Sequence, residues 1–134
     1  MKKDFDNWNK KKKIVNDKEV EKIFFKEREI WWVNLGLNVG YELDGKNEDF
    51  SRPVIIFRKF NQDTFWALPL TTKNKKNQYH FSFRLPDGTK NSVNLSQLRL
   101  IDAKRLIVKL GYISEKDYEA LQKKISEIVN RKAV

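Results

Sequence analysis

The sequence predicts a mainly β protein of the α+β class: a small, strongly bent barrel of about five to seven antiparallel strands, with a C-terminal helix and an N-terminal helical extension. Short apolar runs bounded by turn residues recur through the middle of the chain. None of these runs has the strand, helix and strand spacing of a parallel sheet. A chain of 134 residues is long enough for one domain with a core and too short for two ordinary domains.

The first part of the chain, residues 1–27, is predicted to be the helical extension. We expect a helix over 4–15, because Asp4 and Asp6 suit the positive end of a helix dipole and Lys10–Lys13 suit its negative end. The lysine run is interpreted as a solvated helix end, and contact with RNA is the alternative.

A second helical segment is predicted over 18–25, where Val20, Ile23 and Phe24 follow an i, i+3, i+4 pattern. Beyond it the periodicity changes, and the barrel domain is predicted to span 28–134. Its expected strands are 30–35, 53–57, 64–70, 79–85, 92–95 and 98–101.

The clearest strand is 79–85, in which apolar and polar residues alternate as they do on a half-buried strand. Pro86, Asp87 and Gly88 follow it and are the residue types that a hairpin turn requires. Between the first two strands lies a loop, 36–51, of about fifteen residues, which is long enough to suggest a function.

The last predicted element is a helix that begins after Ser114, a good N-cap residue followed by acidic residues in the first turn. The apolar face of this helix has residues at steps of three, four and three: Tyr118, Leu121, Ile125 and Ile128. We expect this face to close the barrel or to lie in a dimer interface.

The chain is strongly basic, with a net charge of +10 and a pI near 9.7. Clustered lysine and arginine favour an anionic partner, because they displace counterions from a polyphosphate. Charge alone does not separate a nucleic acid from an acidic protein partner or from a proteome rich in lysine.

The chain has no cysteine and a single histidine, His80. These counts exclude disulfides, thiolate sites and multi-histidine metal centres, so acid–base chemistry is left to Arg, Thr, Tyr, Lys or carboxylates, and no metal or cofactor is expected. The N-terminus lacks the apolar region of a signal peptide, and no run of residues is apolar enough to span a membrane. We therefore expect a cytoplasmic protein.

One arginine and two threonines stand at the ends of neighbouring predicted strands. Arg52 precedes the apolar run of one strand, and Thr71 and Thr72 follow that of the next. A guanidinium can donate two parallel hydrogen bonds to a phosphate, and a hydroxyl adds a donor or an acceptor, so the set predicts a phosphodiester site. The alternatives are a surface arginine paired with Glu48 or Asp49, and an ordinary threonine at a strand end.

Four segments occur in an order and spacing typical of one protein family: REIWWVNLGLNVGYE at 28–42, SRPVIIF at 51–57, FWALPLTT at 65–72 and LSQLRLIDAKRL at 95–106. Together they resemble the MazF/PemK-type toxin endoribonucleases of bacterial toxin–antitoxin pairs, over roughly residues 28–130. The resemblance implies an SH3-like barrel of the CcdB/MazF type, a homodimer and metal-independent cleavage of single-stranded RNA. It also implies an acidic antitoxin as the inhibiting partner.

By the same resemblance, Arg52 and Thr71 match the catalytic pair of the family. The candidate RNA-binding residues are Glu42, Thr72, Lys73, Lys75, Lys76 and Arg99. The lysines are equally well part of a solvated turn, and Gln97 and Arg99 are expected first to hold the strand and loop beneath the site. Three aromatic residues are candidates for stacking on bases: Trp8, Tyr41 and Trp66. For Trp66 a core or dimer-interface position is the alternative.

Three functions fit the sequence. The first is an endoribonuclease toxin with Arg52 and Thr71 in its site. The second is a non-cleaving toxin of the same fold, of the gyrase-poison (CcdB) type, which does not need that pair. The third is a non-catalytic RNA-binding barrel that uses only its basic surface, whose RNA affinity would fall steeply with salt and survive the loss of Thr71.

Overall fold

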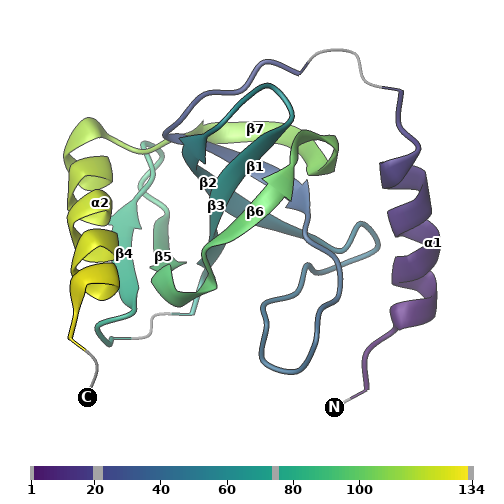
Figure 1. Ribbon diagram of the computed structural model, residues 1–134, viewed down its shortest axis with the longest axis horizontal. Helices are drawn as coiled ribbons and strands as arrows, with labels where there is room; N and C mark the ends of the chain where they lie inside the picture. The colour runs from purple at the N-terminus through teal and green to yellow at the C-terminus, as the bar shows by residue number, and fades with distance from the viewer. Residues whose placement is uncertain (1, 20–22, 74–75, 133–134) are drawn as a thin grey trace.

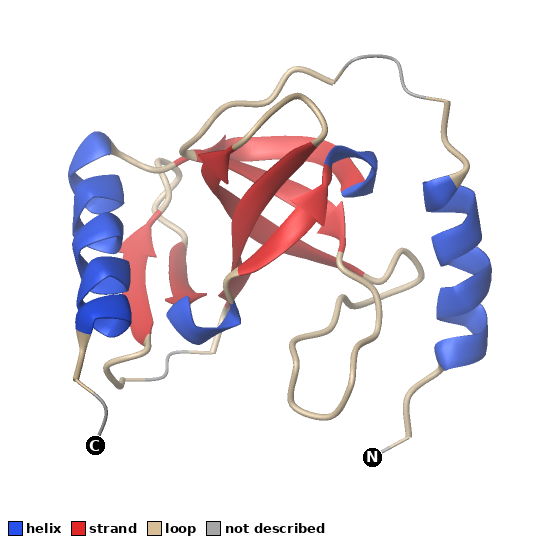
Figure 2. Ribbon diagram, in the orientation of Figure 1, coloured by secondary structure: helices blue, strands red, loops and turns tan. Residues whose placement is uncertain are grey.

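The computed structural model describes residues 2–19, 23–73 and 76–132, and it shows a curled β sheet between two helices (Figures 1 and 2). The helices are α1 (Phe5–Asn16) and α2 (Glu115–Asn130), with the short 3₁₀ turns η1 (Leu95–Gln97) and η2 (Ala103–Arg105). The strands are β1 (Glu29–Asn34), β2 (Ser51–Lys59), β3 (Thr64–Thr71), β4 (His80–Arg84), β5 (Lys90–Asn94), β6 (Arg99–Asp102) and β7 (Leu106–Tyr112).

All strand pairs are antiparallel, in the order β4-β5-β3-β2-β1-β7, and β6 also pairs with β3. Strand β5 pairs with the end of β3 and β6 with its beginning, so one long strand supports two parts of the sheet. The pairing of β2 with β3 shifts register between Ile56 and Arg58, and such an irregularity bends a strand. The predicted mainly β fold of up to seven strands is confirmed.

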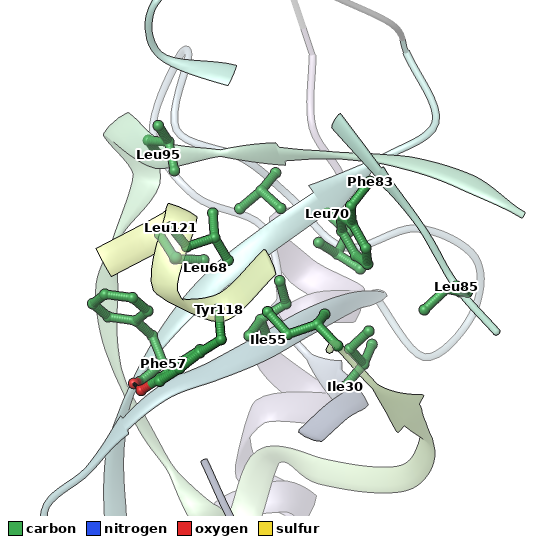
Figure 3. Packing of buried hydrophobic residues seen from close by; sticks show 12 residues of the cluster. Ile30, Ile55, Phe57, Leu68, Leu70, Phe83, Leu85, Leu95, Tyr118 and Leu121 are labelled. Carbon is green, nitrogen blue, oxygen red and sulfur yellow. Dashed lines mark hydrogen bonds between the residues drawn. The ribbon is translucent and has the colours of Figure 1, made fainter. Parts of the chain in front are cut away.

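Helix α2 covers one face of the sheet. Ser114 caps it by accepting a hydrogen bond from the backbone N–H of Asp117 at 3.1 Å. Tyr118 and Leu121 pack among buried residues of the sheet, and the Tyr118 hydroxyl donates a hydrogen bond to the carbonyl of Phe57 (Figure 3). The predicted apolar face of this helix therefore closes the barrel. The hairpin turn expected before β5 is also present, with Gly88 at a φ of 89°.

The opposite face of the sheet is covered in part by Phe25, which precedes β1. Its ring lies 5.1 Å from the ring of Phe65, and its carbonyl accepts a hydrogen bond from Lys59 Nζ at 2.9 Å. The helix predicted over 18–25 is wrong for residues 18–19 and 23–25, which are not helical, while 20–22 lie outside the described residues. Insertion of the Phe25 ring into the core outweighs the local helical pattern.

Helix α1 matches the predicted N-terminal helix and lies at the end of the molecule opposite α2 (Figure 1). Asp4 caps it by accepting a hydrogen bond from Asn7 N at 3.2 Å. The loop between β1 and β2 lies between the barrel and α1. Trp8 is buried against this loop, with 6% of its surface exposed, so its expected role in stacking on bases is wrong.

Strand β7 was not predicted. Its residues LIVKLGY place apolar side chains on both sides of the strand, so the period of two that marks a half-buried strand is missing. Strand β7 pairs with β1, and several of its apolar side chains are exposed: Ile107, Val108, Leu110 and Tyr112.

Candidate functional site

The end of the β2–β3 ladder brings Arg52 and Thr71 together. Val54 pairs with Pro69, and continuing this antiparallel register places Arg52 opposite Thr71. The guanidinium Nη1 of Arg52 donates a hydrogen bond of 3.0 Å to the carbonyl of Leu70, the neighbour of Thr71. Two residues from separate sequence motifs therefore meet at one end of the β2–β3 ladder.

The Arg52 side chain is held in place by backbone carbonyls. Its Nε donates to the carbonyl of Asp44 at 2.7 Å, and only 9% of the residue is exposed. Burial lowers the pKa of Arg52 below its ordinary value, and the Asp44 charge opposes this shift. The alternative pairing of Arg52 with Glu48 or Asp49 is wrong: among the described residues Arg52 forms no ion pair with either carboxylate and bonds to backbone carbonyls instead, and Asp49 pairs with Lys11 at 3.0 Å. Among the described residues, nothing accepts a hydrogen bond from Nη2 of Arg52, so this nitrogen remains available to a ligand.

Arg52, Thr71 and Thr72 line a cavity of about 310 Å³. The Thr71 hydroxyl accepts a hydrogen bond from Lys73 N at 3.2 Å, so its own proton remains available for donation. The apolar lining of the cavity comes from Trp32, Pro53, Leu70, Leu85 and Leu110, and its further polar lining comes from Lys46, Asn47, Ser51, Asp87, Thr89 and Asn91. The volume of the cavity and its mixed polar and apolar lining suit a small ligand or a single unit of a polymer.

Several lining residues were not predicted from the sequence. Lys46 and Asn47 come from the long loop before β2, and Asp87, Thr89 and Asn91 come from the β4–β5 hairpin. The hairpin turn was recognised, but its position beside Arg52 depends on the pairing of β5 with the end of β3. For Lys46 and Asn47 the only signal in the sequence is the unusual length of the loop that carries them.

The other candidates within the described residues, Glu42, Lys73, Lys76 and Arg99, do not line this cavity. Glu42 is exposed, and its carboxylate accepts a hydrogen bond from Val39 N at 2.8 Å within its own loop. Burial lowers the pKa of Arg99, and the charge of Glu42 partly opposes that shift. Lys73 and Lys76 are exposed after Thr72, and Lys75 lies outside the described residues.

Gln97 has the structural role expected of it. Its amide oxygen accepts a hydrogen bond from Leu43 N at 3.1 Å, and its amide nitrogen donates to the carbonyl of Tyr41 at 3.3 Å. The turn before β6 is thereby tied to the long loop. Tyr41 and Trp66 have exposed side chains, and Trp66 packs edge-on against Phe60 with ring centroids 5.0 Å apart.

The described residues contain no group of three or more His, Cys, Asp or Glu side chains arranged to hold a metal ion. Neither helix in the described part of the chain has the length and apolar character needed to cross a membrane.

The family model of the PemK-like, MazF-like toxin of type II toxin–antitoxin systems matches residues 26–129. Among solved structures, an endoribonuclease in complex with its cognate antitoxin from Mycobacterial species is similar, with a TM-score of 0.60 and 13% sequence identity over 83% of this chain and 100% of that chain. The Mycobacterium tuberculosis toxin MazF-mt6 is similar with a TM-score of 0.57 and 18% identity, over 79% and 100% of the two chains. A search of curated proteins finds no match.

At these identities the two solved structures support the fold alone. The family match is independent of them, and it covers most of the chain from just before β1 to the last turn of α2. It also includes Arg52 and Thr71, the two residues that the fold brings to one cavity. The chain therefore belongs to the PemK-like, MazF-like family of toxins of type II toxin–antitoxin systems.

Proposed function

We propose that this toxin is a metal-independent endoribonuclease that cleaves single-stranded RNA in the cytoplasm. The observation that carries the proposal is the meeting of Arg52 and Thr71 at one cavity. In the proposed reaction the ribose 2′-oxygen forms a bond to the adjacent phosphorus while the bond from phosphorus to the 5′-oxygen breaks. The 2′-hydroxyl loses its proton, and the departing 5′-oxygen gains one.

Arg52 stabilises the negative charge that develops on the phosphoryl oxygens during this step. Its Nε and Nη1 are already bonded to the carbonyls of Asp44 and Leu70, so the guanidinium is oriented before RNA arrives. The free Nη2 donates to a phosphoryl oxygen. The Thr71 hydroxyl donates to the same phosphoryl group or hydrogen-bonds to the 2′-hydroxyl.

The RNA backbone approaches along the basic segment after β3. Thr72 lies at the cavity, Lys73 and Lys76 are exposed beyond it, and Lys75 belongs to the same segment of the sequence. Clustered lysines attract a polyphosphate by counterion release, which makes the affinity fall with added salt. We include Glu42 and Arg99 as residues that contact RNA outside the cavity.

A cognate acidic antitoxin is the proposed inhibitor. The chain carries a net charge of +10, which favours an acidic protein partner as well as RNA. Family membership supports the same partner, and one structural relative was solved in complex with its cognate antitoxin.

We also propose that the toxin is a homodimer that pairs through β7. Within the described sheet, β7 pairs with β1 alone, and it exposes Val108, Leu110 and Tyr112. An exposed apolar edge strand favours burial against a second copy. Light scattering should give about 32 kDa, twice the chain mass of 16.0 kDa, and Val108→Glu should give the monomer. A wild type that stays monomeric at micromolar concentration would contradict the dimer.

The ribonuclease proposal is tested by incubating the purified protein with a long single-stranded RNA in the presence of EDTA. We expect discrete cuts that leave 5′-hydroxyl ends. Thr71→Val, which keeps the shape of the side chain and removes the hydroxyl, should abolish the cuts, and Thr71→Ser should retain them. Cleavage by Thr71→Val at the wild-type rate would refute the assignment of the hydroxyl.

Folded wild-type protein that cuts no RNA would refute the ribonuclease proposal. Inhibition of DNA gyrase would then identify a toxin of the gyrase-poison type. RNA binding that weakens steeply with salt and persists in Thr71→Val would identify a non-catalytic RNA-binding barrel.

A further inference from the structure

Asp44 connects the N-terminal extension to the catalytic arginine. Its backbone carbonyl accepts the hydrogen bond from Arg52 Nε. Its carboxylate accepts a hydrogen bond from Asn38 N at 2.6 Å and forms an ion pair with Lys3 Nζ at 2.9 Å. The position of the carbonyl that orients Arg52 therefore depends on contacts made by a residue near the N-terminus.

Lys3 is bound by the loop through all of its donors. In addition to the Asp44 carboxylate, its ammonium donates to the carbonyls of Asn38 at 2.6 Å and Gly40 at 2.9 Å. An ammonium has three protons, and the loop supplies an acceptor for each. Only 8% of the Lys3 side chain is exposed, so removal of its charge leaves partly buried oxygen atoms without a donor.

Trp8 packs on both ends of the same loop. The Trp8 ring contacts Gly36 so closely that a Cβ atom added to Gly36 would lie 2.2 Å from a ring carbon. The centre of the Trp8 ring lies 5.6 Å from the centre of the Phe50 ring. Gly36 N donates to the carbonyl of Phe50 at 2.9 Å, so the two ends of the loop are also joined to each other. The Arg105 guanidinium lies 5.7 Å from the centre of the Trp8 ring.

The C-terminal end of α1 is anchored separately. Lys104 Nζ in η2 donates to the carbonyl of Asn16 at 2.9 Å, and Lys18 Nζ donates to the carbonyl of Lys104 at 3.1 Å. Along the middle of α1, Lys11 pairs with Asp49. The extension is thus attached to the loop and to η2 at several points, and the family match begins only at residue 26.

We propose that residues 2–18 act as an internal brace that holds the β1–β2 loop in the conformation that orients Arg52. Lys3 and Trp8 are then positioning residues for the cleavage reaction, which do not contact the RNA. A long surface loop without regular secondary structure is ordinarily mobile, and motion of Asp44 would move the carbonyl bonded to Arg52. This inference rests on the proposed role of Arg52 in RNA cleavage.

Lys3→Met tests the brace, with Lys12→Met as the matched control, because both remove one positive charge and Lys12 is exposed on α1. We expect Lys3→Met to lower kcat about tenfold and to leave KM within about twofold, since RNA binding is kept while Arg52 is misplaced. The Gly45 amide, which donates to the carbonyl of Gly36 at 2.7 Å, should exchange its hydrogen about tenfold faster. Lys3→Arg should restore most of both properties, and Lys12→Met should resemble the wild type.

The inference is overturned if Lys3→Met and Lys12→Met have the same kcat and the same Gly45 exchange rate, even if Lys3→Met has a lower Tm. A fall in Tm alone would show that the extension only stabilises the fold. If the wild type cuts no RNA, the ribonuclease proposal fails, and amide exchange alone decides: faster Gly45 exchange in Lys3→Met supports the brace, and unchanged exchange overturns it.

Discussion

Replacement of Arg52 by lysine separates the charge of this residue from its geometry. The guanidinium donates through Nε to Asp44 and through Nη1 to Leu70, and Nη2 is available for a phosphate. A lysine keeps the positive charge but concentrates its donors on one atom. It therefore cannot reach both carbonyls and the phosphate in the arrangement that a planar guanidinium allows.

The expected loss follows from the bonds that disappear. Arg52→Lys loses at least one of two charge-assisted hydrogen bonds, each of which contributes about 1.5–3 kcal/mol, so the free energy of unfolding should fall by about 2 kcal/mol. For a chain of 134 residues the unfolding entropy is about 0.28 kcal/mol/K, and Tm should fall by about 7 °C. Loss of the donor to the phosphoryl group should lower kcat by about 100-fold or more.

The assay combines urea denaturation with cleavage of a fixed RNA under single-turnover conditions. The control is Arg58→Lys in the same strand, because the Arg58 side chain is exposed and its ion pair with Glu27 is long, at 3.7 Å. This control should change the unfolding free energy by less than about 0.5 kcal/mol and leave cleavage unchanged. An Arg52→Lys protein with wild-type cleavage would refute the need for the planar fork, and one with wild-type stability would refute the structural role of its bonds.

Three further predictions concern packing, pH and the loop. Leu121→Ala should lower the free energy of unfolding, measured by urea denaturation, by about 3 kcal/mol because Leu121 is fully buried. The control Val129→Ala, on the exposed side of α2, should lower it by less than about 0.5 kcal/mol. Burial raises the pKa of Tyr118 above its ordinary value of 10.0, so the contribution of this hydroxyl to stability is complete below about pH 10 and is lost as pH rises through the raised pKa. Tyr118→Phe should therefore reduce the loss of stability at alkaline pH, and it should lower stability at neutral pH by about 1 kcal/mol because the hydrogen bond to the Phe57 carbonyl is lost. If the variant and the wild type lose stability with pH in the same way, the burial of the hydroxyl is contradicted. Gly45→Ala should lower RNA cleavage at least about tenfold, since its Cβ would lie 1.6 Å from a backbone carbonyl of the same loop, while Gly111→Ala, where nothing lies within 4 Å, should behave as the wild type.

The elements that could be predicted from the sequence are those with a strong local signal. The strand at 79–85 alternates cleanly, and the last helix has both a cap residue and an apolar face. Local signals failed where a long-range contact decided the conformation. Phe25 lies in a segment with a helical pattern, but its ring is used in the core. In β7 apolar residues stand on both sides of the strand, so the period of two that marks a half-buried strand is missing.

The sequence by itself determined the family, the class of fold and the two residues proposed for catalysis, because these depend on motifs that are continuous in the chain. Only the tertiary structure decided what surrounds Arg52. The carbonyl of Asp44, the β4–β5 hairpin and the contact of Lys3 with the loop come from distant parts of the chain, and antiparallel pairing and burial bring them together. Trp8 shows the same limit, since a tryptophan in a lysine-rich helix looks exposed until the loop that covers it is placed.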